Sequence, residues 1–123
     1  MSISAQRLFG RVARTLAVPA EEPRVVEDFL EAVNQTSRDV YNYAHVSVSD
    51  IDAVSDAIDA DETTFGNAYW YGIMHRMQMW NYADKASERD YYGLLMNELR
   101  RAQVEYFEDE DNDVHAKLGD LSD

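Results

Sequence analysis

The chain has 123 residues, a length that fits a single domain able to bury its own hydrophobic core. It contains no cysteine, which excludes a disulfide framework, a thiolate metal site and a cysteine nucleophile. No apolar run reaches the length of about 18 residues that a membrane span needs, so we expect no membrane partner.

The formal net charge is −13, from 24 acidic residues against 11 lysines and arginines. Only Lys85 and Lys117 are lysines, and this acid-rich, lysine-poor composition resembles that of proteins from halophilic archaea and their viruses. In such a protein the charge says little about partners, because the Debye length is about 3 Å at 1 M salt. In any other protein it would argue against nucleic-acid binding by the whole surface.

The charge is unevenly distributed along the chain. Residues 1–20 contain three arginines and no acid, whereas residues 108–123 contain seven acids and one lysine. We therefore expect three parts, which are a basic amphipathic N-terminal helix (1–18), a helical bundle (19–108) and an acidic tail (109–123).

The first predicted helix runs from a serine cap to about residue 17, and Pro19 ends it. Ser2 or Ser4 can provide the cap, because a serine hydroxyl accepts from the free N–H groups of the first turn. The same acid-free start also resembles a mitochondrial transit peptide, which the acidic remainder of the chain disfavours. Three arginines at i, i+4 and i+7 are expected to face solvent or a neighbouring acidic surface: Arg7, Arg11 and Arg14.

A second helix is predicted over residues 23–44, because Pro23 suits a first helical turn and apolar residues then follow at helical spacing. Residues 45–49 alternate apolar and polar and predict a short extended linker. A short third helix is expected over residues 50–60, with three apolar residues on its inner side and aspartates facing water. A calcium loop needs a glycine at position 6, where loops that start at Asp50 or Asp59 would have Ser55 or Thr64, so no metal site is predicted. The inner residues are Ile51, Val54 and Ile58.

Residues 64–83 form the most apolar stretch and predict a central helix that begins at a cap within residues 61–64. Gly66 falls on its main apolar face, where a glycine favours a close helix crossing. A helix that is apolar on two sides is central, or is shared between a core and a partner. The main face carries Tyr69, Trp70, Ile73, Met74, Met77 and Trp80, and the opposite face carries Tyr71, His75, Met79 and Tyr82.

The last long helix is predicted over residues 88–108, after a capping box formed by Ser87 and Asp90. Its 3–4 spacing predicts a packing seam through Tyr92, Leu95, Leu99, Ala102 and Tyr106. In the acidic tail, two alternatives stay open, a disordered segment or a short docking helix. The docking helix would use three apolar residues at helical spacing: Val114, Leu118 and Leu121.

No motif for catalysis, cofactor binding or metal binding is found. None of His45, His75 and His115 has a second ligand at metal spacing, and the scattered glycines form no phosphate loop. Asp39 is expected on a helix surface, although it borders a core face. We therefore expect no enzyme, no cofactor and no metal, with a helical enzyme centred on His75 as one alternative.

These observations predict an all-α fold, an antiparallel helical bundle of four main helices plus one short helix, with an acidic C-terminal tail. The layout of residues 23–123 resembles that of the head–tail adaptor (connector) proteins of tailed viruses, here a haloarchaeal one. Those are small helical proteins that ring the portal and use a terminal extension to clasp it. No diagnostic motif accompanies the layout, so no residue role is carried over.

The expected function is that of a non-enzymatic structural or assembly protein, acting as a homo-oligomer or within a larger complex. The resemblance implies portal-like ring or tail components as partners, in the virion or in the cytoplasm of a halophilic host, and no secretion signal is recognised. The second alternative is a small binding module whose basic N-terminal helix contacts DNA, without sequence specificity, or another anionic surface. The expected interface residues are Tyr71, His75, Met79, Tyr82, Arg7, Arg11, Arg14, Val114, Leu118 and Leu121.

Overall fold

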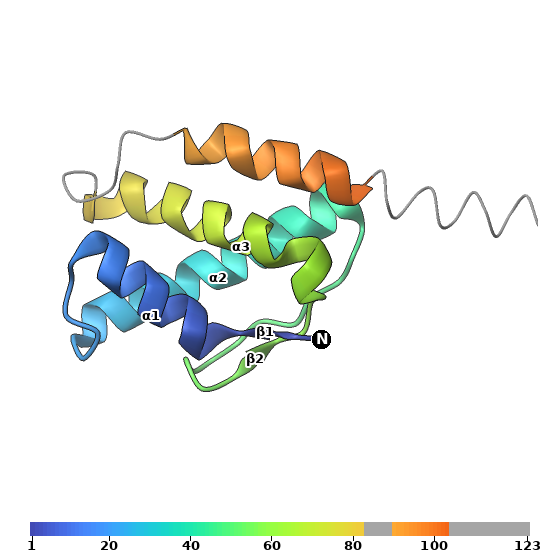
Figure 1. Ribbon diagram of the computed structural model, residues 1–123. Helices are drawn as coiled ribbons and strands as arrows, with labels where there is room; N and C mark the ends of the chain where they lie inside the picture. The colour runs from blue at the N-terminus through green and yellow to red at the C-terminus, as the bar shows by residue number, and fades with distance from the viewer. Residues whose placement is uncertain (83–89, 104–123) are drawn as a thin grey trace, which may run out of the picture.

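The computed structural model describes residues 1–82 and 90–103 (Figure 1). It is mostly helical, which confirms the all-α class. Across the described ranges, no helix combines the length and the apolar content that crossing a membrane requires. The elements are β1 (Ile3–Ser4), α1 (Ala5–Leu16), α2 (Pro23–Ala44), β2 (Ala57–Ile58), α3 (Glu62–Met77), the π-helix η1 (Gln78–Tyr82) and a last helix over residues 91–103.

The sequence predicted α1 and α2 with their bounds. Ser4 caps α1, since its hydroxyl accepts a hydrogen bond from the Arg7 N–H at 3.2 Å. Ala17 ends the helix with a left-handed φ of 54°, and its N–H bonds to carbonyls of the last turn. Pro23 begins α2, and His45 ends it in the same left-handed conformation. Both helices turn an apolar side to the core, where Phe9 of α1 and Phe29 of α2 are in ring contact at 4.8 Å.

The predicted helix over residues 50–60 is wrong. The Asp56 carboxylate accepts hydrogen bonds from the Asp52 and Ala53 N–H groups, which holds this segment in a turn rather than a helix. Ile51 is still buried, because the Asn34 side chain bonds both its N–H and its carbonyl. Ile58 is buried as part of β2, which pairs antiparallel with β1. The apolar spacing therefore identified two buried residues correctly, while Val54 is half-buried and the predicted helix does not form.

The central helix begins two residues earlier than residue 64, and Asp61 is its cap. The Asp61 carboxylate accepts from the Thr64 N–H and hydroxyl, and these bonds hold the pKa of Asp61 below its ordinary value. The regular helix ends at Met77, and the chain continues as η1 to Tyr82. The side chains of five main-face residues are buried and Trp80 is half-buried: the five are Tyr69, Trp70, Ile73, Met74 and Met77.

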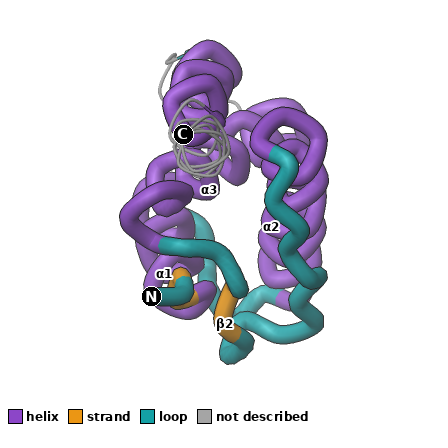
Figure 2. The backbone as a smooth tube through the Cα atoms, turned by 90° about the vertical axis from the view of Figure 1, so that its right-hand side faces the viewer, coloured by secondary structure: helices purple, strands orange, loops and turns teal. Residues whose placement is uncertain are grey.

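The last helix covers α3 (Figures 1 and 2). Asp90 caps it by accepting from the Gly93 N–H at 2.9 Å, while Ser87 lies outside the described residues. The predicted seam is wrong at one position, because Tyr91 is buried and Tyr92 is 52% exposed. Tyr91 packs near Tyr71 of α3, with ring centroids 6.4 Å apart. Leu95, Leu99 and Ala102 are buried as predicted, and Tyr106 lies outside the described residues.

The close crossing of α2 and α3 occurs at Gly72, which corrects the prediction for Gly66. A Cβ added at Gly72 would lie 2.5 Å from the Thr36 hydroxyl oxygen of α2. A Cβ at Gly66 would meet only the Glu62 side chain, at an ordinary distance of 3.6 Å. Gly72 therefore allows the two helices to approach closely, whereas Gly66 has room for a side chain.

Candidate interaction surfaces

A polar network joins α2 and α3 beside the Gly72 crossing. Arg76 of α3 donates to the Asp39 carboxylate at 2.5 Å and to the Gln35 side-chain oxygen at 3.1 Å. The ion pair is largely buried, with 12% of the Arg76 side chain and 22% of the Asp39 side chain exposed. Arg76 also donates to Thr36, so its guanidinium is bonded to three side chains of α2. These hydrogen bonds position α3 relative to α2.

Sequence reasoning missed Arg76 and expected Asp39 on the surface. Arg76 and Asp39 lie on different helices. The residue spacing within one helix therefore does not identify a partner on the other helix. The one available signal was that Gly72, which allows the crossing, lies one turn before Arg76. The helix crossing was predicted at Gly66 instead, so the Arg76–Asp39 pair beside Gly72 was not predicted.

A second buried bond lies at the same crossing. The Tyr69 and Ser37 hydroxyls are 2.7 Å apart, and both side chains are buried. Burial raises the pKa of Tyr69 to about 12, although the Ser37 hydrogen bond acts in the opposite direction. Tyr69 is therefore neutral at physiological pH. Within residues 1–82 and 90–103, no buried side-chain nitrogen or oxygen lacks a hydrogen-bond partner.

The opposite face of α3 is shared between the last helix and solvent. Tyr71 is half-buried against Tyr91, and the His75 ring lies 5.1 Å from that of Tyr92. Burial lowers the pKa of His75, and the neighbouring Arg76 guanidinium lowers it further. Tyr71 and His75, two of the expected interface residues, thus have ring partners within the chain.

Exposed apolar side chains remain beside this face. Met79 is 62% exposed, and Tyr92 is 52% exposed although it touches His75. We call these two residues the Met79/Tyr92 patch. The side chain of Tyr82, the fourth residue expected on this face, lies outside the described part of the structure.

A second exposed pair lies at the C-terminal end of α2. Tyr41 is 58% exposed and Tyr43 is 44% exposed. We call this exposed end of α2 the Tyr41/Tyr43 patch, and its two tyrosines, two residues apart, project from different sides of the helix. Sequence reasoning placed Tyr41 among the apolar residues of the second helix, so it did not identify this patch.

The three arginines of α1 have different surroundings. The Arg11 guanidinium lies 3.8 Å from the ring centre of Trp70 on α3, a cation–π contact that links the two helices. Arg7 and Arg14 are exposed. Among the described residues, none of the three forms an ion pair. Arg11 therefore contributes to the fold, while Arg7 and Arg14 are available to a partner.

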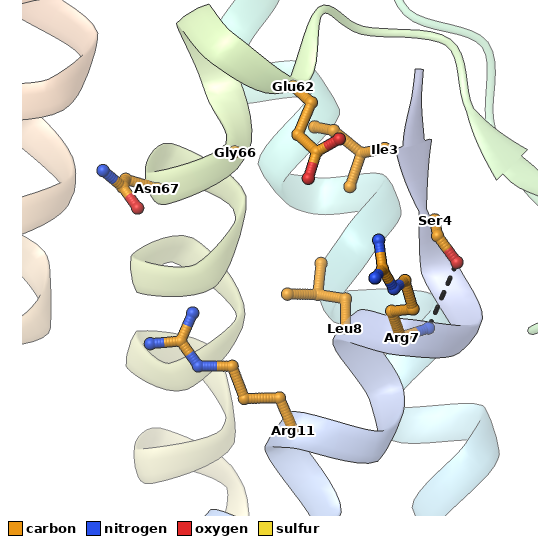
Figure 3. A pocket seen from close by; sticks show the side chains of 8 residues that line it. All are labelled: Ile3, Ser4, Arg7, Leu8, Arg11, Glu62, Gly66 and Asn67. Carbon is orange, nitrogen blue, oxygen red and sulfur yellow. Dashed lines mark hydrogen bonds between the residues drawn. The ribbon is translucent and has the colours of Figure 1, made fainter. Parts of the chain in front are cut away.

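Two hollows flank Arg7. One, of about 300 Å³, lies between the start of α1 and the start of α3 (Figure 3). Arg7 rises into it from α1 and Glu62 descends from α3, so the hollow carries both charges. The other, of about 630 Å³, follows the outer side of α1, and we call it the α1 groove. It is lined by Gln6, Arg7, Gly10, Ala13, Arg14, Ala17, Val18 and Ala20.

The expected tail contacts, Val114, Leu118 and Leu121, lie outside the described residues. Across residues 1–82 and 90–103, no three histidine, aspartate or glutamate side chains gather closely enough to hold a metal ion. Comparison of the chain with protein-family models, curated proteins and solved structures finds no match. The functional argument is therefore built on the residues of this chain alone.

Proposed function

We propose that this protein is a non-enzymatic assembly protein that acts as a homo-oligomer or within a larger complex. The more specific form of the proposal is a virion head–tail adaptor from a halophilic system. It includes the antiparallel bundle arrangement and the acidic C-terminal tail. The close packing of α3 against α2 and of the last helix against α3 supports the bundle.

The observation that carries the proposal is the position of the two exposed patches. The Tyr41/Tyr43 patch lies at the end of α2, and the Met79/Tyr92 patch lies where η1 and the last helix begin. In Figure 1, η1 lies at the end of the molecule opposite the end of α2, and the last helix begins between these two ends, nearer to η1. Exposed aromatic and methionine side chains are the types that interfaces concentrate.

Two different patches at opposite ends favour a head-to-tail contact between copies. Such a heterologous contact joins the patch of one copy to the other patch of the next, and it produces a ring when the rotation closes. A ring is the form that an adaptor around a portal would take. The proposal therefore predicts that the two patches contact each other and not themselves.

The first test is the native mass of the full chain, measured by light scattering after size exclusion at low and at molar KCl. We expect a discrete oligomer, formed or stabilised at molar salt. A monomer under both conditions, with the helical signal intact, would contradict the proposal.

The second test mixes two variants, Met79→Ser/Tyr92→Ser and Tyr41→Ser/Tyr43→Ser. Each alone should be largely monomeric, because it has lost one side of the contact. Their mixture should give dimers, because one intact pair of patches remains between the two variants. Dimers in either variant alone, or none in the mixture, would exclude the head-to-tail contact.

The α1 surface supports a second candidate, a binding module for DNA or another anionic surface. Arg7 and Arg14 are exposed, and no ion pair engages them within the described residues. Binding of this kind would depend on backbone phosphates and would weaken steeply with salt. Duplex DNA that remains bound to the wild type but not to Arg7→Glu/Arg14→Glu would favour this candidate.

A further inference from the structure

The α1 groove combines features that define the chemistry of an occupant. Its apolar part is formed by small side chains, and Gly10 has no other atom within 4 Å of where a Cβ would lie. Arg7 and Arg14 both line it, seven residues apart along α1, and none of its lining residues is acidic. The groove therefore fits a segment that carries apolar side chains along one line and carboxylates beside them.

We propose that the α1 groove binds the acidic segment of a second copy of this chain, residues 109–123. That segment has apolar Val114, Leu118 and Leu121 at i, i+4 and i+7, the spacing of one face of a helix. Six acids accompany them: Asp109, Glu110, Asp111, Asp113, Asp120 and Asp123.

The dimensions of the two surfaces agree. Arg7 and Arg14 are seven residues apart on α1, and so are Val114 and Leu121. At 1.5 Å per residue, each interval corresponds to about 10 Å along a helix axis. A docked helix of this segment would place its apolar line over Gly10 and Ala13, while its carboxylates reach Arg7 and Arg14, which lie along one side of that line.

Charge favours the α1 groove over the other surfaces of the protein as the place where the acidic segment binds. Residues 21–123 hold all 24 acids, and the interval 108–123 has the densest cluster in the chain, with seven in 16 positions. Residues 1–20 hold three arginines and no acid. In a chain with a net charge of −13, this basic surface is where an acidic segment meets the least repulsion at low salt, and at molar salt only charges in direct contact would still contribute.

The fold favours a second copy of the chain as the source of the segment that binds in the α1 groove. The last described residue, 103, lies at the end of the molecule opposite the turn between α1 and α2 (Figure 1). The proposed head-to-tail contact would set that end of one copy beside the α1–α2 turn of the next copy. The inference thus rests on the proposed assembly and adds a second contact to it.

The absence of cysteine in the chain allows a direct test. Two full-length variants, Gly10→Cys and Leu118→Cys, are mixed under a mild oxidant, with one carrying a tag that separates it by mass. A disulfide requires Cα atoms within about 7 Å, so it reports docking rather than collision. Ser55→Cys, at an exposed position in the turn before β2 and outside the proposed contacts, replaces Gly10→Cys as the matched control.

We expect a disulfide between the cysteines introduced at positions 10 and 118 of the two variants, in a yield several-fold above that with Ser55→Cys. Adding Arg7→Glu/Arg14→Glu to the groove variant should lower the yield, most strongly at low salt, where the charges are least screened. Circular dichroism establishes that each variant keeps the helical fold. A yield equal to the control would overturn the inference.

Other outcomes also decide the matter. A single chain that carries both cysteines would give a disulfide-linked monomer if its own segment occupies the groove, which would exclude the second copy as the source. Predominant Gly10–Gly10 dimers would show that the groove pairs with itself. An oligomer in light scattering without the disulfide between positions 10 and 118 would leave the proposed assembly standing and remove this contact, whereas a monomer throughout would count against the assembly itself.

Discussion

The two sides of α3 differ in how they are covered. The side toward α2 is closed by Gly72 and by a network in which Arg76, Asp39 and Tyr69 all have partners. The side toward the last helix is closed by aromatic ring contacts, and beside it Met79 and Tyr92 remain exposed. The first side has the properties of an interior contact, and the second side continues into a surface that a partner could cover.

The two sides of α3 thus contain two kinds of residue, those that stabilise the fold and those that remain exposed to a partner. Where a guanidinium is bonded on several sides, as in Arg76, its removal should affect folding. Where large apolar side chains are exposed, as in Met79 and Tyr92, their removal should affect association and leave folding almost unchanged.

The largest effect is expected from Arg76→Met, which keeps the aliphatic bulk and removes the guanidinium. Asp39 and Gln35 would then lie in a largely buried site without their partner. We expect a loss of about 2–3 kcal/mol in the free energy of unfolding, because buried groups that lose charged hydrogen-bond partners carry costs of this size. Urea denaturation measures it.

Arg38→Met is the matched control, because Arg38 pairs with Asp50 at 3.8 Å while both side chains are more than half exposed. An exposed pair of this kind contributes about 0–1 kcal/mol. Equal losses for the two variants would show that the Arg76 network is no more important than a surface ion pair.

An intermediate effect is expected from Gly72→Ala. The added methyl group would collide with Thr36, and displacing α2 should cost about 1–3 kcal/mol, less a helix-propensity gain of about 1 kcal/mol. Gly66→Ala has the same propensity gain without the collision, so it should be neutral or stabilising by up to about 1 kcal/mol. Thermal unfolding compares the two, and a stabilising Gly72→Ala would contradict the close crossing.

The smallest effect concerns His75, on the outer side of α3. Burial and Arg76 lower its pKa below 6.5, while Asp39 and Asp90 act in the opposite direction. As the pH falls, His75 therefore becomes protonated at a higher pH in the unfolded chain than in the folded protein. The contribution of His75 to the free energy of unfolding should be largest above pH 6.5 and should decrease below it.

His75→Gln isolates this contribution from the other titrating groups of the chain. We expect the difference in stability between wild type and variant to change as the pH falls through 6.5, with the variant losing less. Urea denaturation at a series of pH values measures it. A pH-independent difference would mean that His75 titrates as it does in the unfolded chain.

Much of the helical structure could be predicted because its signals are local. The Ser4 cap, the prolines around α2 and the apolar spacing determine where α1 and α2 begin and end. The segment 50–60 was mispredicted because its turn depends on Asp56, and its burial depends on Asn34 and on β1, which is distant in sequence.

The candidate surfaces were harder to predict than the helices. Residue spacing placed Arg7, Arg11 and Arg14 in one row, but it could not show that Arg11 is held over Trp70. The same spacing grouped Tyr71 and His75 with Met79, although a neighbouring helix covers the first two and not the third. Such differences depend on how helices cross, which no single helix encodes.

The pairing of β1 with β2 bears on the order in which the chain folds. It joins residue 3 to residue 58 and closes a loop that contains α1 and α2. Closing so long a loop costs entropy, and a pair of two-residue strands offers few hydrogen bonds in return. The pair should therefore form only after the helices have docked, so the start of the chain is the last part to become ordered and the first to open.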